Sequence, residues 1–424
     1  MVFLNSSLYF VGLFLLDMCV FPFCFFLSLI LTHLSTFLGY IQMAKNADLG
    51  AAKTAKKDEF YTQLTDIEKE MRYYRKHFQG KTVLCNCDDP FESNFFKYFA
   101  LNFNRLGLKK LIATCYYSSP IAGQQLQYGC DANGQMSFYF EDKGVEENKS
   151  KRPYKAVVTQ VYDKMGDGGV DMLDVAELFR TGENELVELE GDGDFRSPEC
   201  LALLDESDIV VTNPPFSLFR VYVATLVEHQ KHFIIIGNVN ALKYKEIFPY
   251  IISNQIWLGA SIHSGDRAFF VPDDYSLDAS TCGIDEATGR KYIRVKGVRW
   301  YTNLDMKQRH EELILVKRYS PENNHSYDNY NAVEVSKTAD IPCDYTGIMG
   351  VPITFFDKFN PDQFEIIWQA SGNTRASAPV EILEQLGYKP SKEDRGGCCL
   401  LNGKRTYDRV FIRNKHPEPP KEVK

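Results

Sequence analysis

The chain has 424 residues, a formal net charge of -8 and eleven cysteines. This length leaves room for two domains with a substantial core, and the acidic balance excludes a protein that binds polyanions over its whole surface. The cysteines are scattered without a C-x-x-C pair, which argues against a disulfide framework or a zinc site and favours a reducing cytoplasm.

The first 42 residues are almost continuously apolar, and Leu8 to Ile41 is long enough to span a membrane. No Lys or Arg precedes Lys45, so the basic region of a signal peptide is missing. One interpretation is a membrane anchor with the remainder of the chain on the cytoplasmic side. The other, which we prefer, is that translation starts at Met43 and that residues 1–42 are an apolar upstream extension without function.

After a first helix that begins near Thr65, the chain continues with a strand, a helix and a second strand. Residues 81–87 form an apolar run, residues 91–106 repeat phenylalanine every four positions, and residues 108–115 form another apolar run. This order is a βαβ unit, which implies parallel strands joined by a right-handed crossover.

Residues 163–174 partly match a calcium-binding loop. Met165 stands where the loop needs an oxygen ligand, and Asp174 replaces the final Glu. The pattern therefore predicts a solvated turn, and we expect no metal site.

A short strand from Leu186 ends at Gly191-Asp192-Gly193-Asp194-Phe195. The glycines break the strand, so an acceptor (Asp194) and an aromatic ring (Phe195) are expected at the edge of the sheet. A plain hairpin turn would have a similar sequence.

The most informative stretch is Asp208 to Phe216. An apolar, β-branched run predicts a buried strand, and Asn213 is held in an extended conformation because it precedes a proline. Pro214 and Pro215 then force a turn. Ser217 is the expected N-cap of a helix over residues 218–228. Strand, rigid loop and helix form the layout in which α/β folds bind ligands at the carboxyl ends of their strands.

This loop has the residues that methyl transfer to an exocyclic amine requires. The nitrogen of an adenine amino group is a poor nucleophile, because its lone pair is delocalised into the ring. Two acceptors, the Asn213 side-chain oxygen and the Pro214 carbonyl, would favour a more tetrahedral nitrogen. Phe216 offers a ring on which an extruded base can stack, which is worth about 1–3 kcal/mol. The alternative is a proline-rich connection without function.

Further apolar strands are expected over residues 232–237 and 256–258. The fold class predicted is α/β, with a doubly wound, mostly parallel sheet in a catalytic core over residues 43–260.

The ordered set Phe60-Tyr61-Thr62, Val83 to Pro90, Gly193-Asp194-Phe195 and Asn213-Pro214-Pro215-Phe216 resembles the motif series of S-adenosylmethionine-dependent amino-methyltransferases. Three stretches are more closely similar to adenine-specific DNA methyltransferases of the EcoRI type: Asn213 to Arg220, Gly297 to Asp305 and Met349 to Pro352. The likeness extends over about residues 58 to 370.

The resemblance implies roles for individual residues. Tyr61 and Thr62 would lie near the methionine end of the cofactor, and Asp194 and Phe195 would contact its adenine. The floor of the cofactor site would be formed by Asn86, Cys87, Asp88, Asp89 and Pro90. The catalytic residues would be Asn213, Pro214, Pro215 and Phe216.

Two features depart from the family pattern. The turn after the first strand has no glycine, and the second strand ends without the acidic residue that usually binds the ribose hydroxyls. Asp88 and Asp89 both remain candidates for that role.

Residues 261–424 are predicted to form the target-recognition and C-terminal region. From Arg290 to Arg318, nine Lys or Arg stand against three Asp or Glu, a local charge of +6, and aromatic residues are interleaved among them. This pattern is expected of contacts to phosphates; a solvated face of mixed charge is the alternative.

The sequence thus predicts a cytoplasmic, monomeric enzyme that transfers a methyl group from S-adenosylmethionine to the N6 atom of a flipped adenine in duplex DNA. A cognate restriction nuclease is a candidate partner. One alternative is an amino-methyltransferase for RNA or a protein glutamine, because such sites can share the loop. A second is a membrane-tethered nucleic-acid-binding protein without catalysis.

Overall fold

The computed structural model describes residues 61–87, 93–115, 126–130, 136–140, 153–271, 281–286 and 288–419. The apolar extension, the expected start at Met43, and Asp88, Asp89 and Pro90 lie outside these residues. Along the described residues, no helix is both long enough and apolar enough to cross a membrane.

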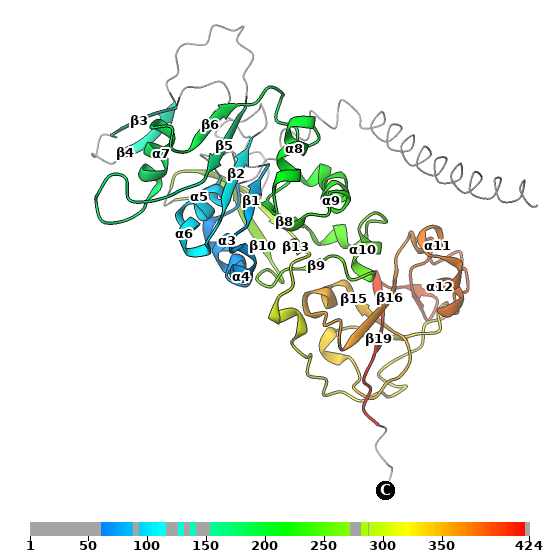
Figure 1. Ribbon diagram of the computed structural model, residues 1–424. Coiled ribbons are helices and arrows are strands. Elements are labelled where there is room, and N and C mark those ends of the chain that lie inside the picture. The colour runs from blue at the N-terminus through cyan, green and yellow to red at the C-terminus, as the bar shows by residue number, and fades with distance from the viewer. Residues whose placement is uncertain are drawn as a thin grey trace, which may run out of the picture. The chain divides into compact units, whose positions relative to one another are not determined.

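The architecture is mixed α/β and is built on a sheet of eight strands in the order β6-β5-β2-β1-β7-β8-β13-β9 (Figure 1). The predicted runs 81–87, 108–115 and 232–237 correspond to three of these strands. The strands are β1 Thr82–Cys85, β2 Lys110–Thr114, β5 Tyr154–Val158, β6 Glu185–Glu188, β7 Ile209–Thr212, β8 His232–Asn238, β9 Trp257–Leu258 and β13 Val298–Thr302.

The four central strands β2, β1, β7 and β8 are parallel to one another, and the predicted parallel pairing of the first two strands is confirmed. The outer pairs β2 with β5, β5 with β6, β8 with β13 and β13 with β9 are antiparallel. The sheet is therefore mixed, and the prediction of a mostly parallel sheet holds only for its centre.

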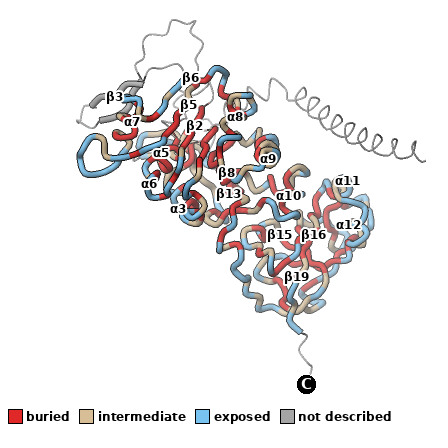
Figure 2. The backbone as a smooth tube through the Cα atoms, in the orientation of Figure 1, coloured by how far each residue is buried: buried red, intermediate tan, exposed pale blue. Residues whose placement is uncertain are grey.

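Each central strand buries both of its faces, because side chains along a strand alternate in direction. Val83 and Leu111 pack into one core cluster, together with Phe95 of α5. Leu84 packs into a second cluster with Tyr222 of α9. The central strands are accordingly drawn almost wholly in the buried colour in Figure 2.

The helices from α3 to α10 divide between these two clusters. Residues of α3, α4, α5, α6 and α7 enter the first cluster, and residues of α8, α9 and α10 enter the second. The helices are α3 Leu64–Met71, α4 Arg75–Phe78, α5 Asn94–Leu101, α6 Phe103–Leu106, α7 Met172–Arg180, α8 Pro198–Glu206, α9 Phe219–Glu228, α10 Phe248–Ile252, α11 Thr374–Ser377 and α12 Val380–Gln385.

Strand β13 enters the large sheet from a part of the chain that follows residue 260. It pairs with β8 from Val298 with Asn238 to Thr302 with Ile234, and all five of its residues are buried. The large sheet therefore includes residues from both sides of the expected boundary at 260.

The remaining strands form smaller sheets. These are β10 Asp266–Phe270 with β12 Lys291–Lys296 and β11 Cys282–Ile284; β14 Val333–Glu334, β15 Met349–Pro352, β19 Arg409–Asn414 and β16 Phe364–Ala370; β17 Leu400–Leu401 with β18 Lys404–Arg405; and β3 Leu126–Cys130 with β4 Met136–Phe140. The 3-10 helices are η1 Phe216–Leu218, η2 Val239–Lys243, η3 Lys307–His310, η4 Thr338–Asp340 and η5 Ile353–Lys358.

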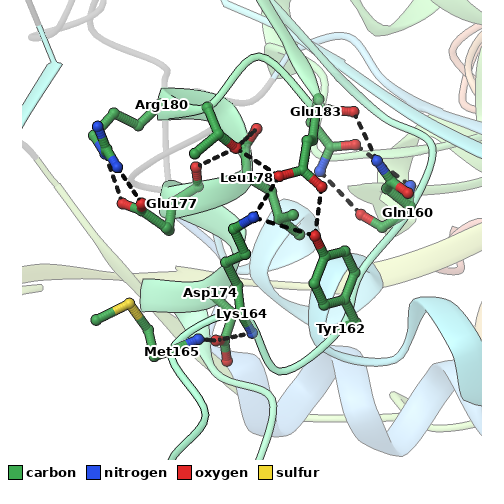
Figure 3. Close-up of polar contacts among 11 residues, drawn as sticks. Gln160, Tyr162, Lys164, Met165, Asp174, Glu177, Leu178, Arg180 and Glu183 are labelled. Carbon is green, nitrogen blue, oxygen red and sulfur yellow. Dashed lines mark hydrogen bonds and ion pairs between the residues drawn. The ribbon is translucent and has the colours of Figure 1, made fainter.

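The segment that resembles a calcium loop is an exposed turn, as predicted. The Asp163 carboxylate accepts hydrogen bonds from the backbone N–H groups of Gly166, Asp167 and Gly168. Asp174 accepts from the N–H of Lys164 at 2.7 Å (Figure 3) and, in a capping box, from the N–H of Asp171, which is the N-cap of α7. In the part of the chain that the structure describes, no group of three or more His, Cys, Asp or Glu could hold a metal ion.

Candidate active site

The carboxyl ends of the four parallel strands lie side by side along one edge of the sheet. β1 pairs with β7 through Val83 with Ile209 and Leu84 with Val210. Asn86 follows β1 and Asn213 follows β7, so the first candidate cofactor residue and the first candidate catalytic residue leave neighbouring strands at this edge. Ligands of open α/β sheets bind at such an edge.

The Asn213 loop has a buried beginning and a partly exposed end. Asn213 is 7% exposed and Pro214 is also buried, whereas Pro215 and Phe216 are half-buried. The chain then passes through η1 into α9. The N-cap of α9 is Leu218, without a side-chain hydrogen bond, so the prediction of Ser217 as N-cap is wrong. The intervening 3-10 turn, closed by the Leu218 N–H and the Pro215 carbonyl at 2.9 Å, displaces the helix start.

Phe216 is held by an aromatic contact with β10. Its ring meets that of Phe269 edge to face, with centroids 6.4 Å apart and planes at 89°. Phe269 is 1% exposed, so the Phe216 ring has one fixed, buried neighbour while keeping part of its own surface accessible. This arrangement leaves a ring surface on which a planar ligand can stack.

Tyr222 of α9 connects two of the candidate cofactor segments. Its hydroxyl donates a hydrogen bond to Oδ1 of Asn86, which follows β1. Its ring packs edge to face on Phe195 with centroids 4.9 Å apart. Tyr222 is 1% exposed, so this link lies in the second core cluster beneath the edge of the sheet.

Gly193 seats the Asp194 segment against the end of β2. Its φ is +77°, and a Cβ at this position would lie 2.1 Å from the carbonyl oxygen of Cys115. Only glycine allows this backbone approach. The close contact brings Asp194 and Phe195 to the same edge of the sheet as Asn86 and Asn213.

The Asp194 carboxylate is bound by its neighbour Arg196. The Nε and backbone N–H groups of Arg196 both donate to Oδ1 of Asp194 at 2.9 Å. Burial favours the neutral acid, but the hydrogen bonds from Arg196 outweigh it and hold the pKa of Asp194 below its usual value. Any ligand amine that reaches Asp194 therefore meets a carboxylate already shared with a guanidinium.

Tyr61 and Thr62 lie beside the three-stranded sheet. Tyr61 exchanges two backbone hydrogen bonds with Phe270, at 2.9 and 3.0 Å. The Thr62 carbonyl accepts from the Asn94 side chain at 2.7 Å, at the start of α5. The Thr62 hydroxyl is buried and has no hydrogen-bond partner among the described residues, which is unusual for a buried polar atom and leaves it available to a ligand.

The structure thus brings Asn86, Cys87, Asp194, Phe195 and the Asn213 loop to one edge of the sheet. Tyr61 and Thr62 are linked to that edge through β10, which carries Phe269 next to Phe270. Three residues of this region were not predicted from the sequence: Tyr222, Arg196 and Phe269. Tyr222 lies within the predicted helix over residues 218–228, and no sequence signal distinguishes it from its core neighbours.

The basic stretch from Arg290 to Arg318 is not one surface, contrary to expectation. Arg299 is 4% exposed and ion-paired with Asp357, with Nε 2.6 Å from Oδ1. Arg309 is buried, with its guanidinium 3.7 Å from the Trp257 ring centroid. Arg318 is paired with Asp344 and Glu418.

The aromatic residues of this stretch divide in the same way: Trp300 and Tyr301 belong to the core, whereas Tyr292 is half-buried. The number of charged residues in a stretch does not show which cationic side chains are buried in the core, because burial depends on long-range packing.

Comparison with known proteins shows the family of the chain. The family model described as adenine-specific methyltransferase EcoRI matches residues 48–415. The Type II methyltransferase M.EcoRI of Escherichia coli is 42% identical over 378 residues, which are 88% of this chain and 99% of that protein. The Type II methyltransferase M.MpnI of Mycoplasma pneumoniae is 35% identical over 368 residues, 86% of this chain and 97% of that protein. No solved structure matches the chain. The chain belongs to the EcoRI family of adenine-specific methyltransferases.

Proposed function

We propose that this protein transfers a methyl group from S-adenosylmethionine to the N6 atom of an adenine in duplex DNA. Family membership supports adenine-specific methylation, and two of the relatives are named as Type II methyltransferases. The observation that carries the residue assignment is that the Asn213 loop leaves β7 next to the strand end that bears Asn86. A methyl donor and an acceptor amine bound there would be neighbours.

We infer further that the large sheet is the doubly wound core of the S-adenosylmethionine-dependent fold. Helices on both faces and four adjacent parallel strands support this. In this proposal the catalytic core of residues 43–260 is completed by β13, and the rest of residues 261–424 serves target recognition. Residues 1–42 would be the upstream extension.

The residues at the edge of the sheet fit S-adenosylmethionine. The buried Thr62 hydroxyl, which lacks a partner among the described residues, suits the polar methionine end of this molecule. The Asp194 carboxylate and the Phe195 ring suit its adenine, with Asn86 and Cys87 between them; Asp88, Asp89 and Pro90 complete the proposed set. When bound, S-adenosylmethionine supplies an electrophilic methyl group on a sulfonium centre.

The chain's own residues would hold the acceptor. An adenine extruded from the duplex, at a cost of a few kcal/mol, stacks on the accessible part of the Phe216 ring. The Asn213 side-chain oxygen and the Pro214 carbonyl accept hydrogen bonds from its amino group and orient the nitrogen lone pair. Pro215 stiffens the corner, since its φ is restricted. Positioning and preorganised acceptors account for the catalysis.

We propose that the protein acts as a monomer in the cytoplasm, without a metal ion, and that a cognate restriction nuclease is its candidate partner. A single adenine per catalytic event needs only one copy of the Asn213 loop, and Type II relatives support the restriction-modification context.

The test is a competition assay. The purified chain is incubated with methyl-labelled S-adenosylmethionine and equal amounts of duplex DNA and RNA, and the digested nucleosides are identified by mass spectrometry. We expect N6-methyldeoxyadenosine. Preferential labelling of RNA, or of the protein fraction of a cell extract at glutamine, would overturn the proposal in favour of those alternatives.

A further inference from the structure

The three-stranded sheet β10-β12-β11 has one face in the core and one face outward. Ile293 and Val295 of β12 pack against the first core cluster. Because strand side chains alternate, Tyr292, Arg294 and Lys296 point to the opposite face. Arg294 and Lys296 are exposed and Tyr292 is half-buried.

On that outward face, arginines and aromatic rings lie next to one another. Tyr292 stands directly opposite Phe270 in the antiparallel ladder. The Arg294 guanidinium lies 5.5 Å from the Tyr292 ring centroid, and the Arg290 guanidinium lies 4.7 Å from that of Phe270. We name Arg290, Phe270, Tyr292 and Arg294 the arginine–aromatic row; Lys296 lies at its end.

The bare backbone of Gly283 accommodates the Tyr292 ring. Gly283 is paired with Tyr292 in the ladder, and a Cβ at Gly283 would lie 2.7 Å from the Cζ and hydroxyl oxygen of Tyr292. The ring is therefore held close against β11. A base that approaches Tyr292 meets this ring together with the Arg294 guanidinium that lies over it.

The row is joined to the candidate active site through adjacent residues of β10. Phe270 belongs to the row and exchanges backbone hydrogen bonds with Tyr61. Its neighbour Phe269 points inward and contacts Phe216, the proposed base-stacking residue. Phe269 and Phe270 point to opposite faces of β10, so a DNA strand whose adenine stacks on Phe216 would reach the row by passing the edge of this sheet.

The charge of the row is positive in an acidic protein. Among the described residues, Arg290, Arg294 and Lys296 are opposed by two acids: Asp266, which lies opposite Lys296 in the ladder, and Asp285, whose N–H bonds to the Arg290 carbonyl. The pair between Arg294 and Asp266 is 3.7 Å long and solvent-exposed, so it contributes little stability and can exchange for a phosphate.

We infer that the arginine–aromatic row binds the DNA strand that carries the flipped adenine, with Arg290, Arg294 and Lys296 on phosphates and Tyr292 stacked on an unpaired neighbouring base. The inference rests on the proposed function and deepens it. Alternation of aromatic rings with arginines is the chemistry by which unpaired strands are held, since every base has a face that can stack.

The first experiment tests the phosphate contacts with the double variant Arg294→Ala, Lys296→Ala in the full chain. The DNA is a duplex containing the word methylated by the wild type, and affinity is measured at several salt concentrations. We expect the slope of log K against log salt to fall by about two and Kd to rise by about tenfold at low salt. The matched control is Arg180→Ala, Lys389→Ala, which removes two exposed cations from α7 and from the loop after α12; its slope should equal that of the wild type.

The second experiment tests stacking. With 2-aminopurine beside the target adenine, Tyr292→Ala should lose the fluorescence change that accompanies strand distortion, and Tyr292→Phe should keep it. Tyr407→Ala, which truncates a tyrosine that is 87% exposed, is the control. If the wild type methylates DNA and the double variant has an unchanged salt slope, the row does not bind DNA, and the proposed function is unaffected. A wild type without DNA methylation would refute the proposed function itself.

Discussion

The hydroxyl of Tyr222 donates a hydrogen bond to Oδ1 of Asn86 across 136 residues of sequence. This bond connects the helix that follows the Asn213 loop to the end of β1, where the cofactor is expected. A shift of α9 would therefore move both the loop that holds the target base and the residue that borders the donor. We regard Tyr222 as a positioning residue, since it is itself buried.

Tyr222→Phe removes this hydrogen bond and keeps the ring contact with Phe195. The buried Asn86 oxygen would lose its Tyr222 donor, at a cost of about 1–3 kcal/mol. We expect KM for S-adenosylmethionine to rise by about tenfold with a smaller change in kcat. Tyr330→Phe is the control, because the Tyr330 hydroxyl bonds to the Gly397 carbonyl in the C-terminal part. An equal rise in KM for both variants would point to general destabilisation instead.

Asn213→Ala removes one of the two acceptors proposed for the adenine amino group. We expect kcat for DNA methylation to fall by about a hundredfold, the scale for one preorganised polar contact, while DNA affinity changes only a few-fold. Single-turnover kinetics and equilibrium binding measure the two effects separately. Asn323→Ala, at an exposed site of the C-terminal part, should match the wild type. Full activity in the Asn213 variant would exclude the assigned role.

Gly193→Ala adds a methyl group where the backbone of Cys115 stands 2.1 Å away. The Asp194 segment must then move off the end of β2, so we expect weaker binding of S-adenosylmethionine and a lower Tm. Gly182→Ala is a matched control: its φ of +76° imposes the same backbone strain, but nothing lies within 4 Å of the added atom. The difference in affinity between the two variants, measured by calorimetry, isolates the contact. Equal affinities would show that the segment does not border the cofactor.

Arg299→Met leaves the buried Asp357 carboxylate without its ion-pair partner. Burial already raises the pKa of Asp357, and Arg299 opposes this shift. Removal of one member of a buried pair costs about 3–5 kcal/mol, which chemical denaturation would detect. The double variant Arg299→Met, Asp357→Leu should recover part of this loss. In both variants the salt dependence of DNA binding should stay unchanged, because Arg299 is buried. A lower slope of log K against log salt would show that Arg299 does contact a phosphate.

His310 makes stability depend on pH. Its ring contacts Asp362 at 2.6 Å and Asp305 at 2.8 Å, and hydrogen bonds to these two carboxylates raise its pKa above the ordinary value of 6.5. Because the pKa of His310 is higher in the folded than in the unfolded state, its protonation stabilises the fold. This stabilisation is fully present below pH 6.5 and is lost as the pH rises through the folded-state pKa. We expect Tm to fall over that range, less so at 1 M salt.

His310→Gln should remove this part of the pH dependence and leave the remainder of the Tm profile as it is in the wild type. A wild-type Tm that rises through the same range would contradict the assignment.

Local sequence was enough to predict the central strands, the turn after β7 and the family. An apolar run rich in β-branched residues predicts a buried strand without further information, and a proline restricts the backbone wherever it occurs. The tertiary structure alone decided that residues 298–302 return to the large sheet, that Arg299 lies in the core, and that Tyr222 contacts Asn86 and Phe269 contacts Phe216. These features depend on contacts between residues far apart in the chain. Propensity and spacing report on neighbours a few residues away, whereas pairing between distant strands depends on which apolar faces can be buried together.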